Sequence, residues 1–270
     1  MSMTQLPILV LGATGKTGRR IVDRLTARGV PTRAGSRSAE PPFDWNDRST
    51  WAPVLDGAGA VYISYHPDLA FPGAAETVGA FARLAAKRRL VLLSGRGEEE
   101  AQRAEELVQA ASPEVTLIRA SWFSQNFSEN FLVGGVREGV LALPADGIPE
   151  PFVDADDIAD VAVAVLTEPA HAGQVYEVSG PRLLTFAEAV SEIAEATGRA
   201  IRFQPVPIDD YMAEVPDDLA WLLRYLFTEM LDGRNASLTN GVQRALGRPP
   251  RDFRDFARAA AASGVWRPQA

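Results

Sequence analysis

Hydrophobic residues in the first half of the chain form short continuous runs, separated by longer segments with helical spacing. Continuous apolar runs are typical of strands buried on both faces, and apolar residues at i, i+3 and i+4 are typical of amphipathic helices. The pattern predicts strands at residues 6–12, 31–37, 43–45, 60–64, 90–94 and 115–119. It predicts helices at residues 16–28, 73–88 and 98–111, the last of them exposed and acidic. This alternation indicates βαβ units and a parallel sheet.

The rhythm changes after about Leu132, because three prolines interrupt the chain before the next helical pattern. Further on, the pattern predicts a helix at residues 156–167, a strand at 174–178 and aromatic-rich helices around 221–231. Thr185 and Glu188 have the spacing of a capping box, which predicts a helix from there to Gly198.

These elements together predict an α/β fold, a doubly wound parallel sheet of the Rossmann type with a smaller C-terminal substrate lobe. The chain has 270 residues, which is somewhat long for one compact domain and short for two. We expect residues 1–132 to form a dinucleotide-binding core. Residues 133–270 are expected to return to the sheet and to build the smaller substrate-binding lobe.

Composition and charge exclude several classes of protein. Hydrophobic residues make up 46% of the chain and charged residues 23%, as in proteins that fold around a core. The net charge of −8 disfavours nucleic acid as a partner, and the absence of cysteine excludes disulfides and thiolate metal sites. No apolar segment reaches the ~18 residues of a membrane helix, and no secretory signal is evident. We expect a cytoplasmic protein, monomeric or homodimeric, with neither membrane nor nucleic acid as a partner.

A glycine-rich motif, GATGKTG at residues 12–18, lies between the first predicted strand and the first predicted helix. Residues without a Cβ permit a tight turn, and a helix N-terminus offers N–H groups and a positive dipole end to a pyrophosphate. A bare glycine pattern would indicate only a turn, but this position between strand and helix predicts a dinucleotide site. We expect the loop to bind the cofactor through Gly12, Thr14, Gly15, Lys16, Thr17 and Gly18.

The end of the second predicted strand indicates which dinucleotide is bound. An acidic residue there would hold the ribose hydroxyls of NAD, whereas this chain has Ser36 and Arg37, with Arg33 earlier in the strand. A planar guanidinium suits a 2′-phosphate. We prefer Arg37 to Arg33 because Arg37 falls at the strand end, and NADP(H) is the expected cofactor. The alternative is that Arg37 is an ordinary surface arginine.

Six positions along the chain carry a resemblance to a known family. They are residues 12–19 (GATGKTGR), 37, 93–95 (LSG), 117–127 (LIRASWFSQNF), 151–160 (PFVDADDIAD) and 253–266. Together they resemble the NmrA-like atypical short-chain dehydrogenase/reductases over nearly the whole chain. The resemblance is more specific for fold and cofactor than for activity. It implies a family that includes quinone and azo-dye reductases, ketoreductases of natural-product pathways, and redox-sensing regulators that bind the dinucleotide without turning it over.

The Tyr-x-x-x-Lys pair of the larger short-chain superfamily is absent. None of the five tyrosines has lysine four positions later. The chain contains only two lysines, Lys16 in the glycine loop and Lys87 at a predicted helix end. The usual proton donor to the carbonyl oxygen is therefore missing.

Ser94, Tyr65 and His66 are the remaining candidates for catalysis. Ser94 ends a predicted strand at the edge where ligands bind in open α/β sheets, and its hydroxyl can donate one hydrogen bond to a substrate oxygen. Tyr65 and His66 lie in the loop that the resemblance places near the nicotinamide ribose, and histidine titrates near neutrality. Each has a plainer alternative as a backbone, ribose or turn contact. Further candidates for cofactor contact are Trp45, Ser64 and Asn126.

The missing acid predicts an acceptor that delocalises negative charge, held close to the cofactor. The expected function is NADPH-dependent reduction of a ketone or quinone carbonyl of a bulky aromatic, polyketide-like substrate. Ser94 would polarise the carbonyl, and the substrate or water would supply the proton. The expected pocket residues, several of which fit a core equally well, are Arg96, Trp122, Phe123, Phe127, Phe152, Tyr211, Met212, Trp221 and Phe227.

The main alternative is a non-catalytic NADP(H)-binding redox sensor that acts through a partner protein. A hydrolase is not expected, since the G-x-S-x-G motif is absent. A metal site is not expected either, because neither histidine has a ligand-type residue at i+3 or i+4. We interpret Asp154, Asp156 and Asp157 as solvated acidic residues at a helix N-terminus rather than as a cation site.

Overall fold

The computed structural model describes residues 6–268, which form two compact units interleaved along the chain. Unit 1 comprises the described residues up to Ala120, together with Ala155–Val178 and Asn240–Arg248. Unit 2 comprises Ser121–Asp154, Ser179–Thr239 and the described residues from Pro249 onward. Because the chain returns to unit 1 twice, a single boundary near residue 132 does not separate the two units.

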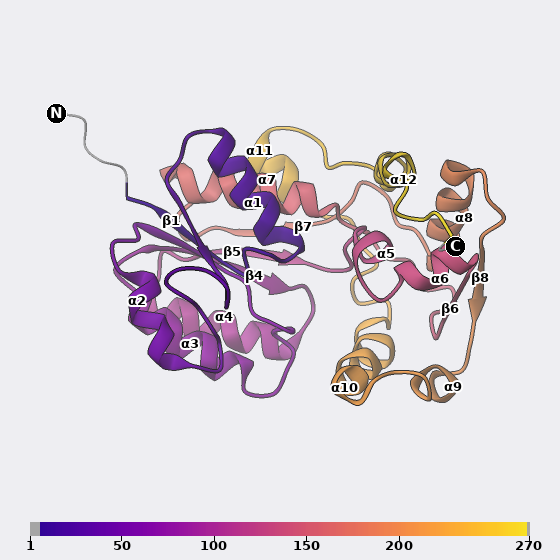
Figure 1. Ribbon diagram of the computed structural model, residues 1–270, viewed down its shortest axis with the longest axis horizontal. Coiled ribbons are helices and arrows are strands. Elements are labelled where there is room, and N and C mark those ends of the chain that lie inside the picture. Colours follow the sequence, from indigo (N-terminus) through magenta and orange to yellow (C-terminus); the bar gives the residue numbers. More distant parts are fainter. Residues whose placement is uncertain (1–5, 269–270) are drawn as a thin grey trace. The chain divides into compact units, whose positions relative to one another are not determined.

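Unit 1 is built around a parallel sheet (Figure 1). Within residues 6–268 the sheet has six strands in the order β2-β1-β3-β4-β5-β7. They are β1 (Ile8–Leu11), β2 (Thr32–Gly35), β3 (Ala60–Ile63), β4 (Arg89–Gly95), β5 (Thr116–Ala120) and β7 (Val175–Val178). All neighbours run parallel, which confirms the predicted doubly wound sheet. Every residue of β1 and β3 is buried, as expected for continuous apolar runs.

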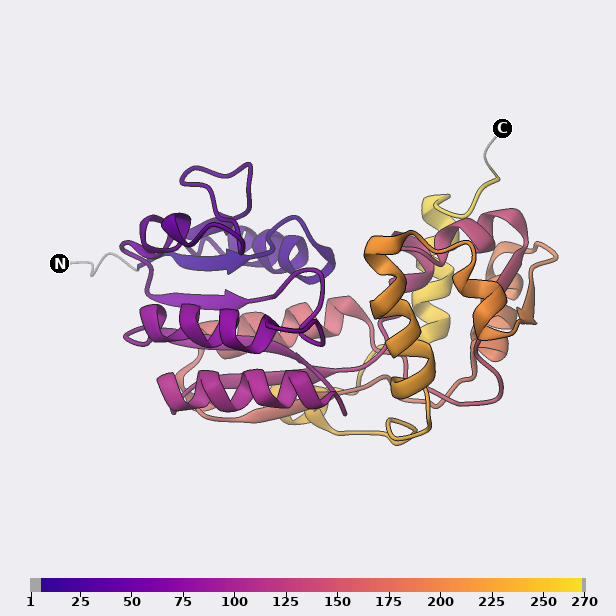
Figure 2. The ribbon, with the colours of Figure 1, turned by 90° about the horizontal axis from the view of Figure 1, so that it is seen from below.

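Helices cover both faces of this sheet (Figures 1 and 2). One face carries α1 (Lys16–Ala27), α7 (Ala155–Thr167) and α11 (Gly241–Leu246), and the other carries α2 (Trp51–Leu55), α3 (Ala74–Ala85) and α4 (Glu99–Ala111). From β1 the chain first adds β2 on one side and then β3 on the other, so the strand order reverses between β1 and β3. Ligands of open parallel sheets bind at the carboxyl ends of strands beside such a switch point.

The prediction of a short third strand at residues 43–45 is wrong, because these residues form a turn. The side chain of Asp44 accepts a hydrogen bond from the amide of Asn46 at 2.9 Å, a contact that competes with strand pairing. Phe43 is buried, and its ring meets that of Trp45 edge-on with centroids 4.9 Å apart. The apolar residues therefore pack beneath a turn.

Unit 2 combines a small parallel ribbon with helices. The ribbon pairs β6 (Val140–Leu143) with β8 (Arg202–Pro205). The helices are α5 (Asn126–Glu129), α6 (Val133–Glu138), α8 (Phe186–Thr197), α9 (Ile208–Met212), α10 (Asp217–Tyr225) and α12 (Phe253–Ser263). The predicted capping box is confirmed, because Thr185 and Glu188 hydrogen bond reciprocally and α8 ends at left-handed Gly198. Among residues 6–268, no helix has the length and apolarity needed to cross a bilayer.

Candidate functional site

The glycine loop turns tightly from β1 into α1. Gly12 has φ of +66°, a left-handed conformation that favours glycine, and its carbonyl accepts a hydrogen bond from the amide of Gly15 at 2.8 Å. A Cβ on Gly18 would overlap the carbonyl oxygen of Gly12. The left-handed backbone at Gly12 and the close approach of Gly18 to the Gly12 carbonyl therefore favour glycine at both ends of the loop.

The start of α1 suits an anion. Gly15 is the N-cap residue, no side chain caps this end among the described residues, and the first turn contains no acidic residue. Helix N-terminal N–H groups and the helix dipole together favour a phosphate. Thr14 and Gly15 are exposed, whereas Thr17 is buried and its Oγ1 accepts a hydrogen bond from the Tyr62 hydroxyl at 2.9 Å. The buried Thr17 side chain thus stabilises the loop through its hydrogen bond with Tyr62.

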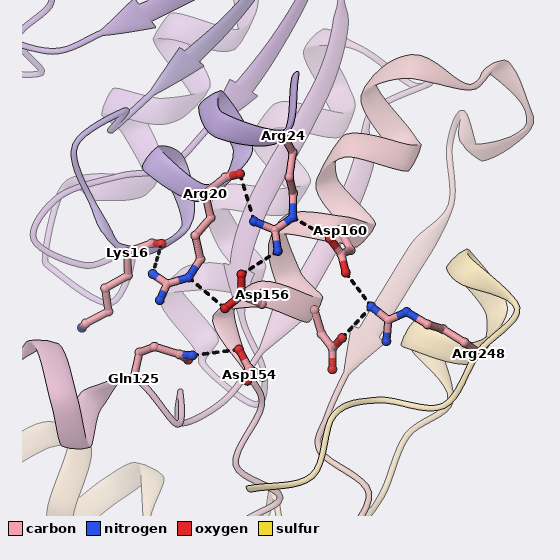
Figure 3. A network of polar contacts seen from close by, with 9 residues as sticks. Lys16, Arg20, Arg24, Gln125, Asp154, Asp156, Asp160 and Arg248 are labelled. Carbon is pink, nitrogen blue, oxygen red and sulfur yellow. Dashed lines mark hydrogen bonds and ion pairs between the residues drawn. The ribbon is translucent and has the colours of Figure 1, made fainter. Parts of the chain in front are cut away.

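Ion pairs fix α1 against α7 (Figure 3). Arg24 binds Asp160 through Nε at 2.6 Å and Asp156 through Nη2 at 2.5 Å, and Arg20 binds Asp156 at 3.2 Å. Burial opposes ionisation of Asp156, but the two arginines hold its pKa below the ordinary value. The expectation that the acidic residues here are solvated is wrong, since Asp156 pairs with arginines and Asp157 is fully buried.

Arg37 is exposed and lies two residues beyond the end of β2. The guanidinium of Arg33 instead donates to the backbone carbonyls of Val54 and Asp56, at 2.7 and 2.5 Å. Within the described residues, no ion pair holds Arg37. Of the two arginines, Arg33 therefore donates hydrogen bonds within the fold, whereas no ion pair among the described residues neutralises the charge of Arg37.

Four residues singled out from the sequence lie together where β1 and β3 end. The Trp45 Nε1 donates to the carbonyl of Ser64 at 3.3 Å, and its ring centroid lies 5.1 Å from that of Tyr65. A Cβ on Gly12 would come within 3.5 Å of the Ser64 Cβ. Tyr65 is half-buried, and burial raises the pKa of its hydroxyl, which makes it a weaker acid. His66, the next residue, is exposed.

Ser94 lies at the carboxyl end of β4 in a buried network of charges. Its Oγ donates to Oε1 of Glu105 at 2.6 Å, and Arg119 binds Oε2 of the same carboxylate at 2.6 Å. Hydrogen bonding to Glu105 raises the pKa of Arg119, and Arg119 also binds Glu177 at 3.1 Å. Arg96, expected in the substrate pocket, is buried in unit 1 and lies 3.6 Å from Glu177. The hydroxyl hydrogen of Ser94 is thus already used in the hydrogen bond to Glu105.

The description of the segment after Ser94 as an exposed acidic helix is wrong for one of its faces. Glu105 is only 2% exposed, on the same side of α4 as the buried Ala101, Ala104 and Val108. Helical spacing with Ala101 and Val108 places Glu105 on this face, but the sequence does not show Ser94 and Arg119, the partners that allow a carboxylate to be buried there.

Two carboxyl groups that the sequence motifs do not single out are those of Asp68 and Glu98. Asp68 follows β3, and Glu98 lies between β4 and α4, so the two carboxyl groups come from loops after adjacent strands. The signal that would have found them is a carboxylate shortly after each of two neighbouring parallel strands, since such strands end at one sheet edge.

The remaining predicted residues belong to unit 2, where some are core. Phe127 and Phe152 are 0% and 2% exposed, with ring centroids 5.4 Å apart. Both rings are occupied by packing and neither is available to a substrate. Trp122 and Phe227 are also buried, with centroids 5.5 Å apart.

The other predicted residues of unit 2 reach its surface. Four of them are partly exposed, namely Phe123, Asn126, Tyr211 and Met212. The Tyr211 ring lies against the Phe227 ring, and burial raises the pKa of its hydroxyl to about 12. Trp221 is 43% exposed and stacks on Tyr225 with centroids 5.3 Å apart. These residues offer apolar surface, and their role in substrate binding stays a prediction.

Solved structures share this fold. The NADPH-dependent quinone oxidoreductase of Escherichia coli, complexed with NADPH, matches 93% of this chain and 99% of its own with a TM-score of 0.76 and 20% identity. The negative transcriptional regulator NmrA, in complex with NADP, matches 97% of each chain with a TM-score of 0.73 and 15% identity. At these identities the likeness concerns the fold alone.

No protein-family model matches the chain. A protein of Streptomyces griseus, the (4-alkanoyl-5-oxo-2,5-dihydrofuran-3-yl)methyl phosphate reductase, is 31% identical over 274 residues, which cover 92% of this chain and 96% of that one. The chain belongs to the NmrA-like atypical short-chain dehydrogenase/reductases. Membership in this family confirms the resemblance found in the sequence, and the Streptomyces griseus relative is named as a reductase.

Proposed function

We propose that this family member binds NADP(H) at the β1–α1 loop and reduces a ketone or quinone carbonyl of a bulky aromatic, polyketide-like substrate. The proposal rests on one observation. A glycine loop opens an uncapped helix N-terminus, and the end of the adjacent strand β2 carries an exposed arginine, Arg37, in place of an acidic residue.

The residues present fit the cofactor. The backbone amides at the start of α1 would bind the pyrophosphate, and Arg37 would pair with the 2′-phosphate. Trp45, Ser64 and Tyr65, gathered at the ends of β1 and β3, would contact the nicotinamide half. When bound, NADPH supplies the hydride for the reduction.

The proposed substrate class follows from the chemistry that the chain lacks and from its relatives. Without a Tyr-x-x-x-Lys pair, acceptors that spread negative charge over a conjugated system are favoured. One structural neighbour is named a quinone oxidoreductase and one relative a reductase of an oxo-dihydrofuran, and these names support a conjugated carbonyl acceptor. The partly exposed aromatic residues of unit 2 would supply apolar contacts.

A non-catalytic NADP(H) sensor is the competing function, favoured by the missing Tyr-Lys pair and by the likeness to a transcriptional regulator. Loss of NADPH absorbance, measured against a panel of quinones and polycyclic aromatic ketones, separates the two. A reductase oxidises NADPH with at least one acceptor class and prefers NADPH to NADH. Tight NADPH binding without oxidation across the panel would instead identify a sensor.

A further inference from the structure

Glu98 has an unusual position at the carboxyl end of β4. Its carboxylate lies over Gly95, so that a Cβ on Gly95 would overlap it. Among the described residues, Glu98 Oε2 is shielded from solvent and has no hydrogen-bond partner. A buried carboxylate oxygen without a donor is costly, and the cost falls when the group holds a proton or meets a ligand.

A second carboxyl group, that of Asp68, comes from the loop after the neighbouring strand β3 and acts electrostatically on Glu98. Asp68 follows β3, and its Oδ1 accepts a hydrogen bond from the amide of Ala70 at 2.9 Å. Burial and the negative charge of Asp68 raise the pKa of Glu98 to about 8. Burial also raises the pKa of Asp68, while the positive charge of Lys16 opposes that rise. At neutral pH the pair therefore retains a proton.

The three charged groups each follow a different strand of unit 1. Lys16 begins α1 after β1, Asp68 follows β3, and Glu98 follows β4. These adjacent strands end at the edge where the strand order reverses, and the same edge carries the glycine loop. A proton held here lies on the ligand-binding edge of the sheet.

We propose that Asp68 and Glu98 share one proton and that Glu98 donates it to the substrate oxygen, in place of the missing tyrosine. This inference rests on the proposed reductase function. As the carbonyl carbon accepts the hydride, the C=O π bond breaks. The O–H bond of the Glu98 carboxyl breaks too, and a new O–H bond forms on the product. Glu98 is left as a carboxylate, Lys16 offsets part of the added charge, and one proton taken up from the solvent restores the protonated pair.

This assignment replaces the expectation that the substrate or water supplies the proton. It gives Glu98 a catalytic role and makes Asp68 and Lys16 positioning residues that set its protonation. It also accounts for glycine at position 95, because any larger residue would displace the carboxyl group.

The kinetic test compares Glu98→Gln with Glu99→Gln, a matched change at the neighbouring exposed glutamate. We expect Glu98→Gln to lower kcat by about 100-fold, the usual contribution of a general acid, and to leave NADPH affinity unchanged. Wild-type kcat should fall as the pH rises through about 8, because the acid loses its proton. Asp68→Asn should shift the fall in kcat to lower pH, because removing the negative charge of Asp68 lowers the pKa of Glu98. A Glu98→Gln enzyme that keeps the wild-type kcat and pH profile would overturn the inference.

A second readout uses the chain without cofactor or substrate. Infrared titration of wild type and Glu99→Gln should show a protonated carboxyl band that disappears around pH 8 and is missing in Glu98→Gln. Absence of this band at neutral pH would refute the shared proton. A wild-type protein that turns over no acceptor would refute the proposed function and the donation step with it. An active wild type with an equally active Glu98→Gln would refute the inference alone.

Discussion

The hydroxyl of Ser94 donates its hydrogen bond to a carboxylate oxygen of Glu105, 2.6 Å away, and both side chains are buried. Arg119 holds the same carboxylate through Nε and Nη2. For Ser94 to donate to a substrate oxygen, as the sequence suggested, this bond would have to break, and Oε1 of Glu105 would keep only the donor from Arg119 Nε, 2.9 Å away. The relationship points to a structural role for Ser94, joining β4 to α4.

We therefore expect Ser94→Ala to lower the free energy of unfolding by about 1–2 kcal/mol while leaving the turnover number close to wild type. Urea unfolding and steady-state rates measure the two effects. Ser191→Ala is the control, because Ser191 is exposed on α8, and its effect should stay within about 0.5 kcal/mol. A loss of turnover without loss of stability would restore Ser94 as the donor to the substrate.

Arg37→Asp should weaken NADPH binding by about tenfold or more and leave NADH binding nearly unchanged. The physical reason is the loss of a charge-assisted contact with the 2′-phosphate, which NADH lacks. Fluorescence titration with both cofactors measures the difference. Arg28→Asp makes the same charge change at the far end of α1 and should alter neither affinity. Equal losses for both cofactors would remove Arg37 from the phosphate site.

Gly18→Ala should lower both stability and NADPH affinity, because its Cβ would overlap backbone atoms of the glycine loop. A cost of about 1–3 kcal/mol is typical of such overpacking. The matched control is Gly134→Ala, a helical position with open space around the added Cβ, where we expect a gain of up to about 1 kcal/mol. Thermal melts with and without NADPH report both quantities. Unchanged NADPH binding in Gly18→Ala would show that the loop is not the phosphate site.

Asp156→Asn should destabilise the protein at neutral pH by about 1 kcal/mol, a modest figure because solvent screens this partly exposed group. The arginines lower the pKa of Asp156, so its contribution is present above the ordinary value of 3.8 and is lost as the pH falls below it. The difference between wild type and variant should therefore shrink in acid. Melting curves at several pH values test this, with the exposed Asp23→Asn as control. A difference that does not change with pH would contradict the ion-pair explanation.

Local pattern was sufficient to find the glycine turn between β1 and α1 and the exposed arginine after β2. The glycines of residues 12–18 and Arg37 are marked by their positions next to strands, and the Thr185 capping box is defined by spacing within one turn. Each of these features depends on neighbours in the sequence. The same holds for the parallel sheet, whose buried strands appear as continuous apolar runs.

Features that depend on partners distant in the sequence could not be found. Glu105 is buried because Ser94 and Arg119 bind it from the sheet. Phe127 was placed in a pocket, although its packing partners place it in the core of unit 2. Asp68 and Glu98 do carry a local signal, a carboxylate shortly after each of two strands, but only the strand order shows that these two strands are neighbours.

The proposed reductase function requires hydride transfer from NADPH to a conjugated carbonyl substrate. Single-turnover mixing of the NADPH-loaded protein with an acceptor from the quinone and aromatic ketone panel tests it most directly. We expect stoichiometric loss of the reduced nicotinamide absorbance, faster with NADPH than with NADH. Bound NADPH that stays reduced in the presence of every acceptor would contradict it.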